Sequence, residues 1–180
     1  MKRASQHPSR LQFIGFALLF LVWLPAPIAR AQNDVCALVP DPHIFGDQIL
    51  RCGTSLTITP APGTVYGEGK AGNPPPASVQ LDSGALLVEF HASRRLRDFQ
   101  ILTPLAIAAV RGTKWAVEAG SDRSSVLALA GTVKVTRPNG ANGVMLQPGQ
   151  GVDVTAMPGP LTVKTWSSER VQALLKRLGQ

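Results

Sequence analysis

The chain has 180 residues, a formal net charge of +7, two cysteines and a hydrophobic fraction of 44%. This length fits one globular domain with an N-terminal extension, because a chain of this size can bury a single core without splitting. The basic charge does not by itself indicate a nucleic-acid-binding protein, because four of the basic residues lie in the N-terminal 31 residues. Binding of nucleic acid would also require basic side chains gathered on one face, with stacking aromatics between them.

Residues 1–31 have the pattern of a cleavable export signal. An apolar run spans Phe13 to Leu24, and Ala29-Arg30-Ala31 provides a small-x-small cleavage site. The run has about a dozen residues, fewer than the roughly 20 that a spanning helix needs, although an uncleaved membrane anchor is the alternative. We therefore expect a periplasmic mature chain that begins at Gln32, has no membrane span and carries a formal charge of +3 (+7 − 4). The basic residues lost are Lys2, Arg3, Arg10 and Arg30.

Cys36 and Cys52 are the only cysteines, and an even number in an exported chain favours a disulfide. The bond would close a loop of about 17 residues and contribute about 3 kcal/mol to stability. A zinc site with His43 and His91 is the alternative, but these four residues lack the paired short spacings of structural zinc sites. We expect residues 32–78 to form an N-terminal arm, irregular or built of short strands, that ends in a loop rich in glycine and proline.

From residue 79 onward, short runs alternate apolar and polar residues with the period of strands. Glycines and Asn-Gly pairs, including Gly84, separate the runs at intervals of about 8 to 15 residues, and no helical pattern intervenes. The spacing predicts an all-β domain over 79–156, as a sandwich, a barrel or a short β-solenoid. Apolar residues that would lie on the same face of a strand are Leu86, Val88 and Phe90; Phe99 and Ile101; Ile107 and Ala109, or Ala108 and Val110; and Trp115 and Val117.

One segment of this region, 99–117, combines a Thr-Pro break, an Arg-Gly-Thr turn and an apolar strand. The residues are Thr103, Pro104, Ala109, Val110, Arg111, Gly112, Thr113 and Trp115. Together they resemble the core motif of the FecR domain, a bacterial periplasmic β-module, and the resemblance extends more loosely over residues 79–154. It implies a flattened, β-solenoid-like sandwich of short strands without enzymatic activity.

Two groups of motif residues have both a structural and a binding interpretation. Arg111 can hold a ligand carboxylate or a partner backbone, but we expect it to satisfy carbonyl groups or to pair with Glu118 or Asp153. Thr103-Pro104 is expected to end one strand and begin the next. A basic cluster that lies outside the motif indicates a solvated turn, or a patch for an anionic ligand. Its members are Arg94, Arg95 and Arg97.

Residues 157–180 form a linker and one amphipathic helix, expected from about Ser168 to Leu178. Four apolar residues fall at i, i+3, i+4 and i+7: Val171, Leu174, Leu175 and Leu178. Ser167 can cap the helix, and Trp166 can form a hydrophobic staple with Val171. Packing of the helix on the sheet is the expected arrangement, and docking on a partner is the alternative.

The sequence contains no recognisable catalytic, metal or cofactor site, and we expect neither an enzyme nor a bound cofactor. Gly67-Glu-Gly-Lys-Ala-Gly72 matches the dinucleotide pattern G-x-G-x-x-G, but three prolines follow where its helix would have to run. No G-x-S-x-G nucleophile motif is present.

The resemblance therefore predicts a non-enzymatic periplasmic interaction module, an accessory or sensory component of an envelope signalling system. Familiar FecR regulators have a cytoplasmic segment and a spanning helix, which this chain is not expected to have. The expected partner is a membrane or periplasmic signalling protein, such as a CHASE-type sensor cyclase, and no nucleic acid. The alternative is a module that binds cell-wall glycan or a small ligand.

Overall fold

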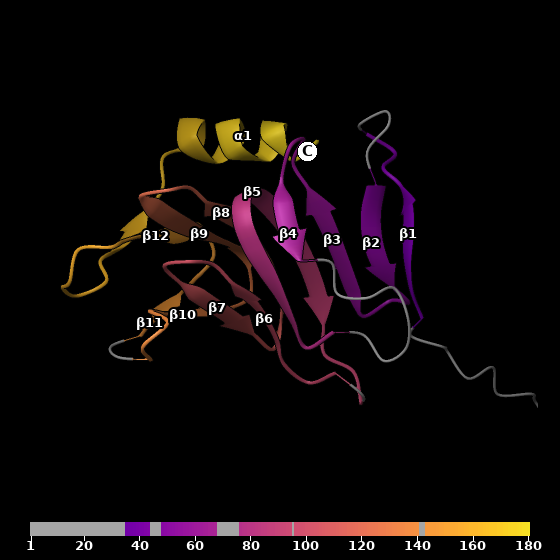
Figure 1. Cartoon of the computed structure of the whole chain (residues 1–180), viewed down its shortest axis with the longest axis horizontal. Coiled ribbons are helices and arrows are strands. Elements are labelled where there is room, and N and C mark those ends of the chain that lie inside the picture. Colours follow the sequence, from indigo (N-terminus) through magenta and orange to yellow (C-terminus); the bar gives the residue numbers. More distant parts are fainter. Residues whose placement is uncertain (1–34, 44–47, 68–75, 95, 141–142) are drawn as a thin grey trace, which may run out of the picture. The chain divides into compact units, whose positions relative to one another are not determined.

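The computed structural model describes residues 35–43, 48–67, 76–94, 96–140 and 143–180. Among them, thirteen strands precede one helix (Figure 1). The strands are β1 (Cys36–Pro40), β2 (Gln48–Cys52), β3 (Leu56–Pro60), β4 (Val65–Gly67), β5 (Ser78–His91), β6 (Phe99–Leu102), β7 (Ile107–Val110), β8 (Gly112–Ala119), β9 (Arg123–Ala130), β10 (Val133–Thr136), β11 (Val144–Leu146), β12 (Gln150–Thr155) and β13 (Val163–Thr165); the helix is α1 (Ser168–Arg177).

The strands form two sheets that share the long strand β5. Sheet A has the order β1-β2-β3-β5-β8-β9-β12-β13. Sheet B has the order β11-β10-β7-β6-β5-β4. All neighbours are antiparallel except β5 and β6. The all-β fold of short strands with one C-terminal helix is thus confirmed.

Gly84 forms the corner at which β5 passes from sheet B to sheet A. Residues 78–83 pair with β4 and β6, whereas residues 84–91 pair with β3 and β8. Gly84 has φ +97°, and a Cβ there would lie 2.7 Å from the Cα of Thr64. The hydroxyl of Thr64 bonds both backbone groups of Ala85, which holds the corner closed. The turn predicted at Gly84 is therefore a bend within one strand.

The main core lies between the two sheets, and aromatic rings fill its centre. Phe99 of sheet B contacts Phe90 and Trp115 of sheet A, with ring centroids 5.8 and 6.0 Å apart. All three side chains are buried, and such tilted pairs add about 0.5–1.5 kcal/mol each beyond their burial. In β7, Ala108 and Val110 point into this core, so the opposite parity of the strand faces outward.

Helix α1 covers the outer face of sheet A. Leu174 and Leu178 are buried against Ala85, Ala116 and other small or apolar residues of β5, β8 and β9. Figure 1 shows the resulting layers, with α1 on one side of β8, β9 and β12 and with β6, β7 and β10 on the other. The predicted helix and its cap are confirmed, because the Ser167 hydroxyl accepts a hydrogen bond from the backbone N–H of Arg170.

The N-terminal segment adds three strands to sheet A. Cys36 of β1 and Cys52 of β2 are directly opposed and joined by a disulfide bond. Most of the expected glycine- and proline-rich loop, residues 68–75, lies outside the described part of the chain, and the two residues before it, Tyr66 and Gly67, belong to β4. The predicted signal segment lies outside it as well. Within the described residues, no helix is long and apolar enough to cross a membrane.

Candidate binding surface

The Thr-Pro part of the motif closes the β6–β7 hairpin. Thr103 is buried, and its Oγ1 accepts a hydrogen bond from the N–H of Ala106 at 2.8 Å. The same oxygen lies 2.8 Å from the hydroxyl oxygen of Ser124, in β9 of the other sheet. Pro104 is exposed at the tip of the turn. Thr103 and Pro104 therefore shape a turn that is anchored to both sheets.

The sequence led us to expect that Arg111 pairs with Glu118 or Asp153, but it pairs with neither. Its side chain is 87% exposed, and its Nε lies 2.8 Å from Oδ1 of Asp98, in the segment before β6. The expectation is wrong because Arg111 stands where the chain leaves sheet B for sheet A at Gly112, next to the β5–β6 connection. An ion pair this exposed contributes at most about 1 kcal/mol. Arg111 therefore remains accessible at the surface.

The other motif residues are structural. Gly112 has φ +141°, in the range that favours glycine, at the passage between the sheets. Thr113 is buried beside Gly131, where a Cβ would lie 2.8 Å from the Thr113 hydroxyl. Trp115 is fully buried in the main core, and its indole N–H has no hydrogen-bond partner among the described residues. Packing and backbone geometry account for the residue types at these three positions.

The basic cluster lies in the connection between β5 and β6. Arg94 and Arg97 are exposed, and Leu96 between them is buried, so it anchors the connection to the core. The backbone N–H of Leu96 also donates to the hydroxyl of Ser93. Arg95 is outside the described residues. The structure thus brings Arg94 and Arg97 into the same connection as Asp98, the partner of Arg111.

The outer face of sheet B, here termed the open face, adjoins this connection. No described helix or strand packs on it, whereas α1 covers the corresponding face of sheet A. One row of side chains crosses it through register partners: Gln100, Ala109, Lys134 and Met145. A hollow of about 500 Å³ opens there, lined by Asp98, Ala109, Val110, Arg111, Thr132, Lys134 and Met145. Met145 is a large apolar residue with 53% exposure.

The hollow adjoins part of the sequence motif, namely Arg111, although no sequence pattern indicated this. Arg111 and Asp98 are on its rim, and Lys134 adds a second positive charge. Met145 is the residue that sequence reasoning missed. Its only signal is an apolar residue between the two inward positions of a short strand, Val144 and Leu146, where a polar residue is usual.

The predicted helix is not free to act as a docking element, because its apolar side is buried on sheet A. Arg170 of α1 also forms a two-pronged ion pair with Asp153 of β12, at 2.6 and 3.0 Å, and its guanidinium carbon lies 3.5 Å from the centre of the Trp166 ring. Ser125 of β9 donates a third hydrogen bond to Asp153 at 2.7 Å. At the other end of the helix, Arg177 pairs with Glu118 of β8.

The charge on Asp153 is stabilised in the folded protein. Partial burial alone raises the pKa of a carboxyl group, but here the hydrogen bonds from Arg170 and Ser125 and the positive charges of Arg170 and Arg123 outweigh burial. The pKa of Asp153 therefore lies below its usual value of 3.8. This carboxylate fixes the helix to the sheet.

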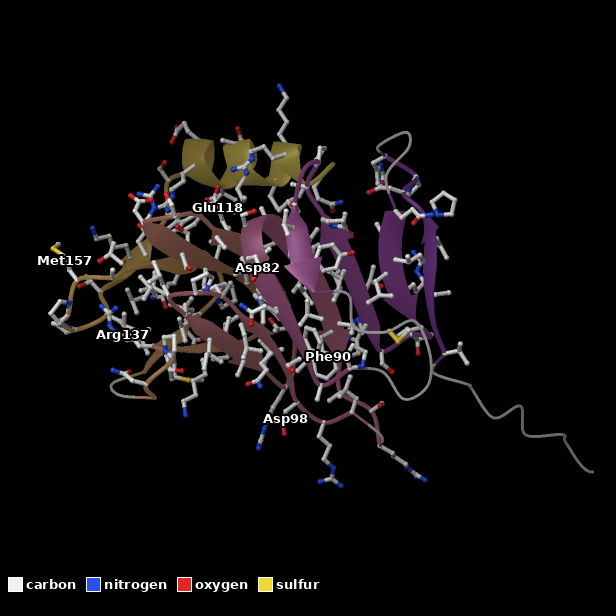
Figure 2. The ribbon with its side chains drawn as sticks, in the orientation of Figure 1. Asp82, Phe90, Asp98, Glu118, Arg137 and Met157 are labelled. Carbon is white, nitrogen blue, oxygen red and sulfur yellow. A yellow bond between two sulfur atoms is a disulfide. The ribbon has the colours of Figure 1, made fainter. Side chains whose placement is uncertain are left out.

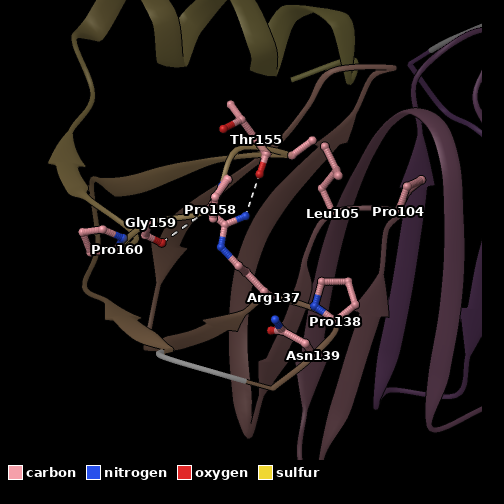
Figure 3. A pocket seen from close by; sticks show the side chains of 10 residues that line it. Pro104, Leu105, Arg137, Pro138, Asn139, Thr155, Pro158, Gly159 and Pro160 are labelled. Atoms are coloured by element: carbon pink, nitrogen blue, oxygen red, sulfur yellow. Dashed lines mark hydrogen bonds between the residues drawn. The ribbon is translucent and has the colours of Figure 1, made fainter.

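A second concave site lies between three loops and was not predicted from the sequence. It has a volume of about 640 Å³ and is lined by Pro104, Leu105, Arg137, Pro138, Asn139, Thr155, Ala156, Pro158, Gly159 and Pro160 (Figure 3). These belong to the β6–β7 turn, the segment after β10, the last residue of β12 and the β12–β13 connection. Of its prolines, Pro104 was expected at a strand break, but nothing in the sequence indicated that the three loops meet.

Neither concave site has the composition of a catalytic centre. In the described part of the chain, no three His, Cys, Asp or Glu side chains are grouped closely enough to hold a metal ion. Four carboxylates, Glu89, Asp98, Glu118 and Asp153, form ion pairs with basic side chains. The arrangement can bind a partner or a small ligand.

Comparison with known families gives one match. Residues 53–134 match the family model described as FecR protein, which is under half of the chain. The match spans β3 to the start of β10 and includes the whole segment 99–117. No curated protein matches the chain significantly.

Solved structures share the fold. They include two crystal structures, at 1.65 and 2.50 Å resolution, of an anti-sigma factor candidate from Parabacteroides distasonis, with TM-scores of 0.55 and 0.53. Each is 19% identical to this chain, and each comparison covers 80% of this chain and 62% of the other. The chain thus spans less than two thirds of the length of these proteins, and at this identity the similarity shows the fold alone.

Proposed function

We propose that the protein is a non-enzymatic interaction module of a bacterial envelope signalling system, because its residues 53–134 match the FecR family model. It acts as an accessory or sensory component that a membrane or periplasmic signalling protein recognises. The similarity in fold to an anti-sigma factor candidate supports a regulatory role of this kind. A CHASE-type sensor cyclase stays a prediction about the partner, since no residue or relative points to that class.

A periplasmic location agrees with two features. The first 31 residues have the pattern of an export signal. The disulfide between Cys36 and Cys52 is compatible with an oxidising compartment, where such bonds persist.

The observation that carries the proposal is the difference between the two outer faces of the sandwich. The middle strands of sheet A are buried on both sides, whereas the open face of sheet B presents an exposed methionine, a hollow and basic residues at its rim. Exposed apolar side chains bordered by polar and charged ones are a usual composition of a transient protein interface. We place the partner on this face.

The edge of sheet B offers a way to hold a partner chain. Strand β11 pairs with β10 on one side only, so in the described part of the chain its other side has no strand partner. An extended segment of the partner can add to such an edge through main-chain hydrogen bonds, while a side chain packs beside Met145. Lys134 and Arg111 favour a partner segment that carries acidic residues.

The test is capture of partners from cross-linked cells of the host with the exported protein as bait. Met145→Glu places a negative charge in the hollow without disturbing the core, because Met145 is exposed. We expect it to reduce capture of the specific partner at least about tenfold. Met157→Glu is the matched control, since Met157 is 75% exposed and lies well away from Asp98 of the open-face rim (Figure 2).

Two results would contradict the proposal. One is recovery of no envelope protein by the unchanged bait. The other is equal loss of the partner with both methionine variants, which would show that the open face has no special role.

A glycan-binding module is the second candidate, favoured by the exposure of Arg94 and Arg97 beside Arg111. Sedimentation with purified peptidoglycan distinguishes it. If the protein sediments and the change of Arg94, Arg95 and Arg97 to alanine abolishes this, the glycan interpretation replaces the one above.

A further inference from the structure

We propose that the pocket between the three loops, here termed the loop pocket, binds a small aromatic carboxylate. Its volume of about 640 Å³ lies within the range of roughly 300–1,000 Å³ that is usual for small-molecule sites. The proposal rests on the walls of this pocket and on one cation, and it is independent of the interaction assigned to the open face.

The walls of the loop pocket are rigid and apolar. Five of the ten lining residues are Leu105 and four prolines: Pro104, Pro138, Pro158 and Pro160. Proline has no backbone N–H and a fixed φ, so these walls offer C–H surfaces and little freedom to collapse. Thr103 further fixes the turn that carries Pro104, through its bonds to Ala106 and Ser124. The pocket is therefore formed before a ligand enters.

Arg137 is the polar centre of the pocket. It donates hydrogen bonds to the carbonyl oxygens of Thr155, Met157 and Gly159, at 2.6, 3.0 and 3.4 Å. The end of β12 and the connection after it thus hold its guanidinium in place, and Figure 3 shows the bonds to Thr155 and Gly159. Carbonyl groups orient the cation but do not neutralise it. Among the described residues no carboxylate pairs with Arg137, and its buried Nε has no hydrogen-bond partner.

These two features define the ligand. A guanidinium that is held in place and has no carboxylate partner favours a ligand with one carboxylate group. The positive charge is delocalised over the whole guanidinium, so a carboxylate in the pocket interacts with it even though Nε itself is buried. Proline rings pack well on aromatic rings, as in the recognition of proline-rich peptides, and the arginine adds a cation–π attraction. A ligand with an aromatic ring and a single carboxylate satisfies both.

The experiment titrates the exported protein with 3-phenylpropionate and with its neutral isostere 3-phenylpropanamide at pH 7, followed by NMR chemical shifts. We expect the acid to bind with a dissociation constant of about 1 mM or lower, with shift changes at the loop pocket. The amide should bind at least about tenfold more weakly, because it lacks the charge. Equal affinity of acid and amide, absence of binding, or shifts confined to another surface would overturn the proposal.

Variants identify the residue responsible. Arg137→Gln removes the charge and keeps donors for the carbonyl groups, and it should weaken binding of the acid at least about tenfold. Lys164→Gln removes a charge near the loop pocket, since Lys164 lines an adjoining concavity next to Thr162 but does not line the loop pocket itself, so the affinity should stay unchanged. If both variants weakened binding of the acid equally, the cause would be a general electrostatic attraction, and this would contradict the assignment of Arg137 as the carboxylate-binding residue. If Arg137→Gln fails to fold, the comparison of acid and amide on the unchanged protein decides.

The outcome is separable from that of the proposed function. Met145→Glu changes the open face and should leave ligand affinity unchanged, whereas Arg137→Gln should leave partner capture unchanged in the absence of ligand. Loss of one property without the other shows which of the two proposals fails.

Discussion

The hydroxyl oxygens of Thr103 and Ser124 lie 2.8 Å apart and connect the two sheets at the end where β6 turns into β7. Thr103 also accepts a hydrogen bond from the N–H of Ala106, and both partners are fully buried. A single side chain therefore closes a hairpin of sheet B and ties it to β9 of sheet A. This explains why a threonine precedes the proline of the motif.

Replacement of Thr103 by valine tests this role. Valine has nearly the same shape but leaves the N–H of Ala106 and the hydroxyl of Ser124 without this partner, so we expect a loss of about 1–3 kcal/mol in the free energy of unfolding. Urea denaturation measures it. Thr165→Val, the same change at an exposed position of β13, should alter stability by less than about 0.5 kcal/mol. Similar effects of both changes would show that the hydroxyl of Thr103 has no special role.

Gly151 of β12 is predicted to be essential for docking of the helix. A Cβ at this position would collide with the indole of Trp166 and would lie 2.8 Å from the carbonyl oxygen of Val126. Gly151→Ala should therefore displace Trp166 and lower the free energy of unfolding by about 1–3 kcal/mol. Gly67→Ala is the control, since a Cβ there meets its nearest atom at 3.5 Å. Denaturation followed by tryptophan fluorescence reports both, and an unaltered midpoint for Gly151→Ala would contradict the close contact.

The strands and the helix were predictable because their side chains repeat with the periods of local structure. Trp115 and Val117 alternate with polar or small residues, and Leu174 and Leu178 lie one helical turn apart. The partner of Arg111 was not predictable, because it depends on the place where the chain crosses between sheets. Pairing of Arg170 with Asp153 likewise requires knowledge of the face that the helix covers.

The two concave sites were harder to predict than the fold, for the same reason. Pro104, Arg137 and Pro158 are separated by some 20 to 50 residues in the sequence and meet only because β6, β10 and β12 end on the same side. The open face depends on an absence of covering elements on sheet B within the described residues, and no local pattern reports that. Periodicity identifies inward positions, but it does not specify which outer face a later helix will cover.

Asp153 makes the stability of the protein depend on pH. Its folded pKa lies below the unfolded value of about 3.8, so its ion pair stabilises the fold above that value and is lost as the pH falls through the folded pKa. Asp153→Asn should lower the free energy of unfolding at pH 7 by on the order of 1 kcal/mol, a modest amount because both side chains are partly exposed. The difference between the two proteins should shrink below about pH 4.

Thermal unfolding of both proteins between pH 3 and pH 7 measures this difference. The control is Asp82→Asn, at an exposed residue of β5, whose effect should be small at every pH. A constant difference between Asp153→Asn and the unchanged protein over the whole range would contradict the assignment of the charge.

The disulfide between Cys36 and Cys52 should contribute about 3 kcal/mol, because it closes a loop of about 17 residues in the unfolded chain. The bond fastens β1 to β2 at the edge of sheet A, so its loss should release mainly these two strands. Both cysteines are buried, and alanine is therefore a better replacement than serine. We expect a reductant to lower the denaturation midpoint of the unchanged protein and to leave that of the variant with Cys36→Ala and Cys52→Ala unaffected. A midpoint that does not respond to reductant in the unchanged protein, or labelling of both thiols without reduction, would show that the bond is absent from the exported chain.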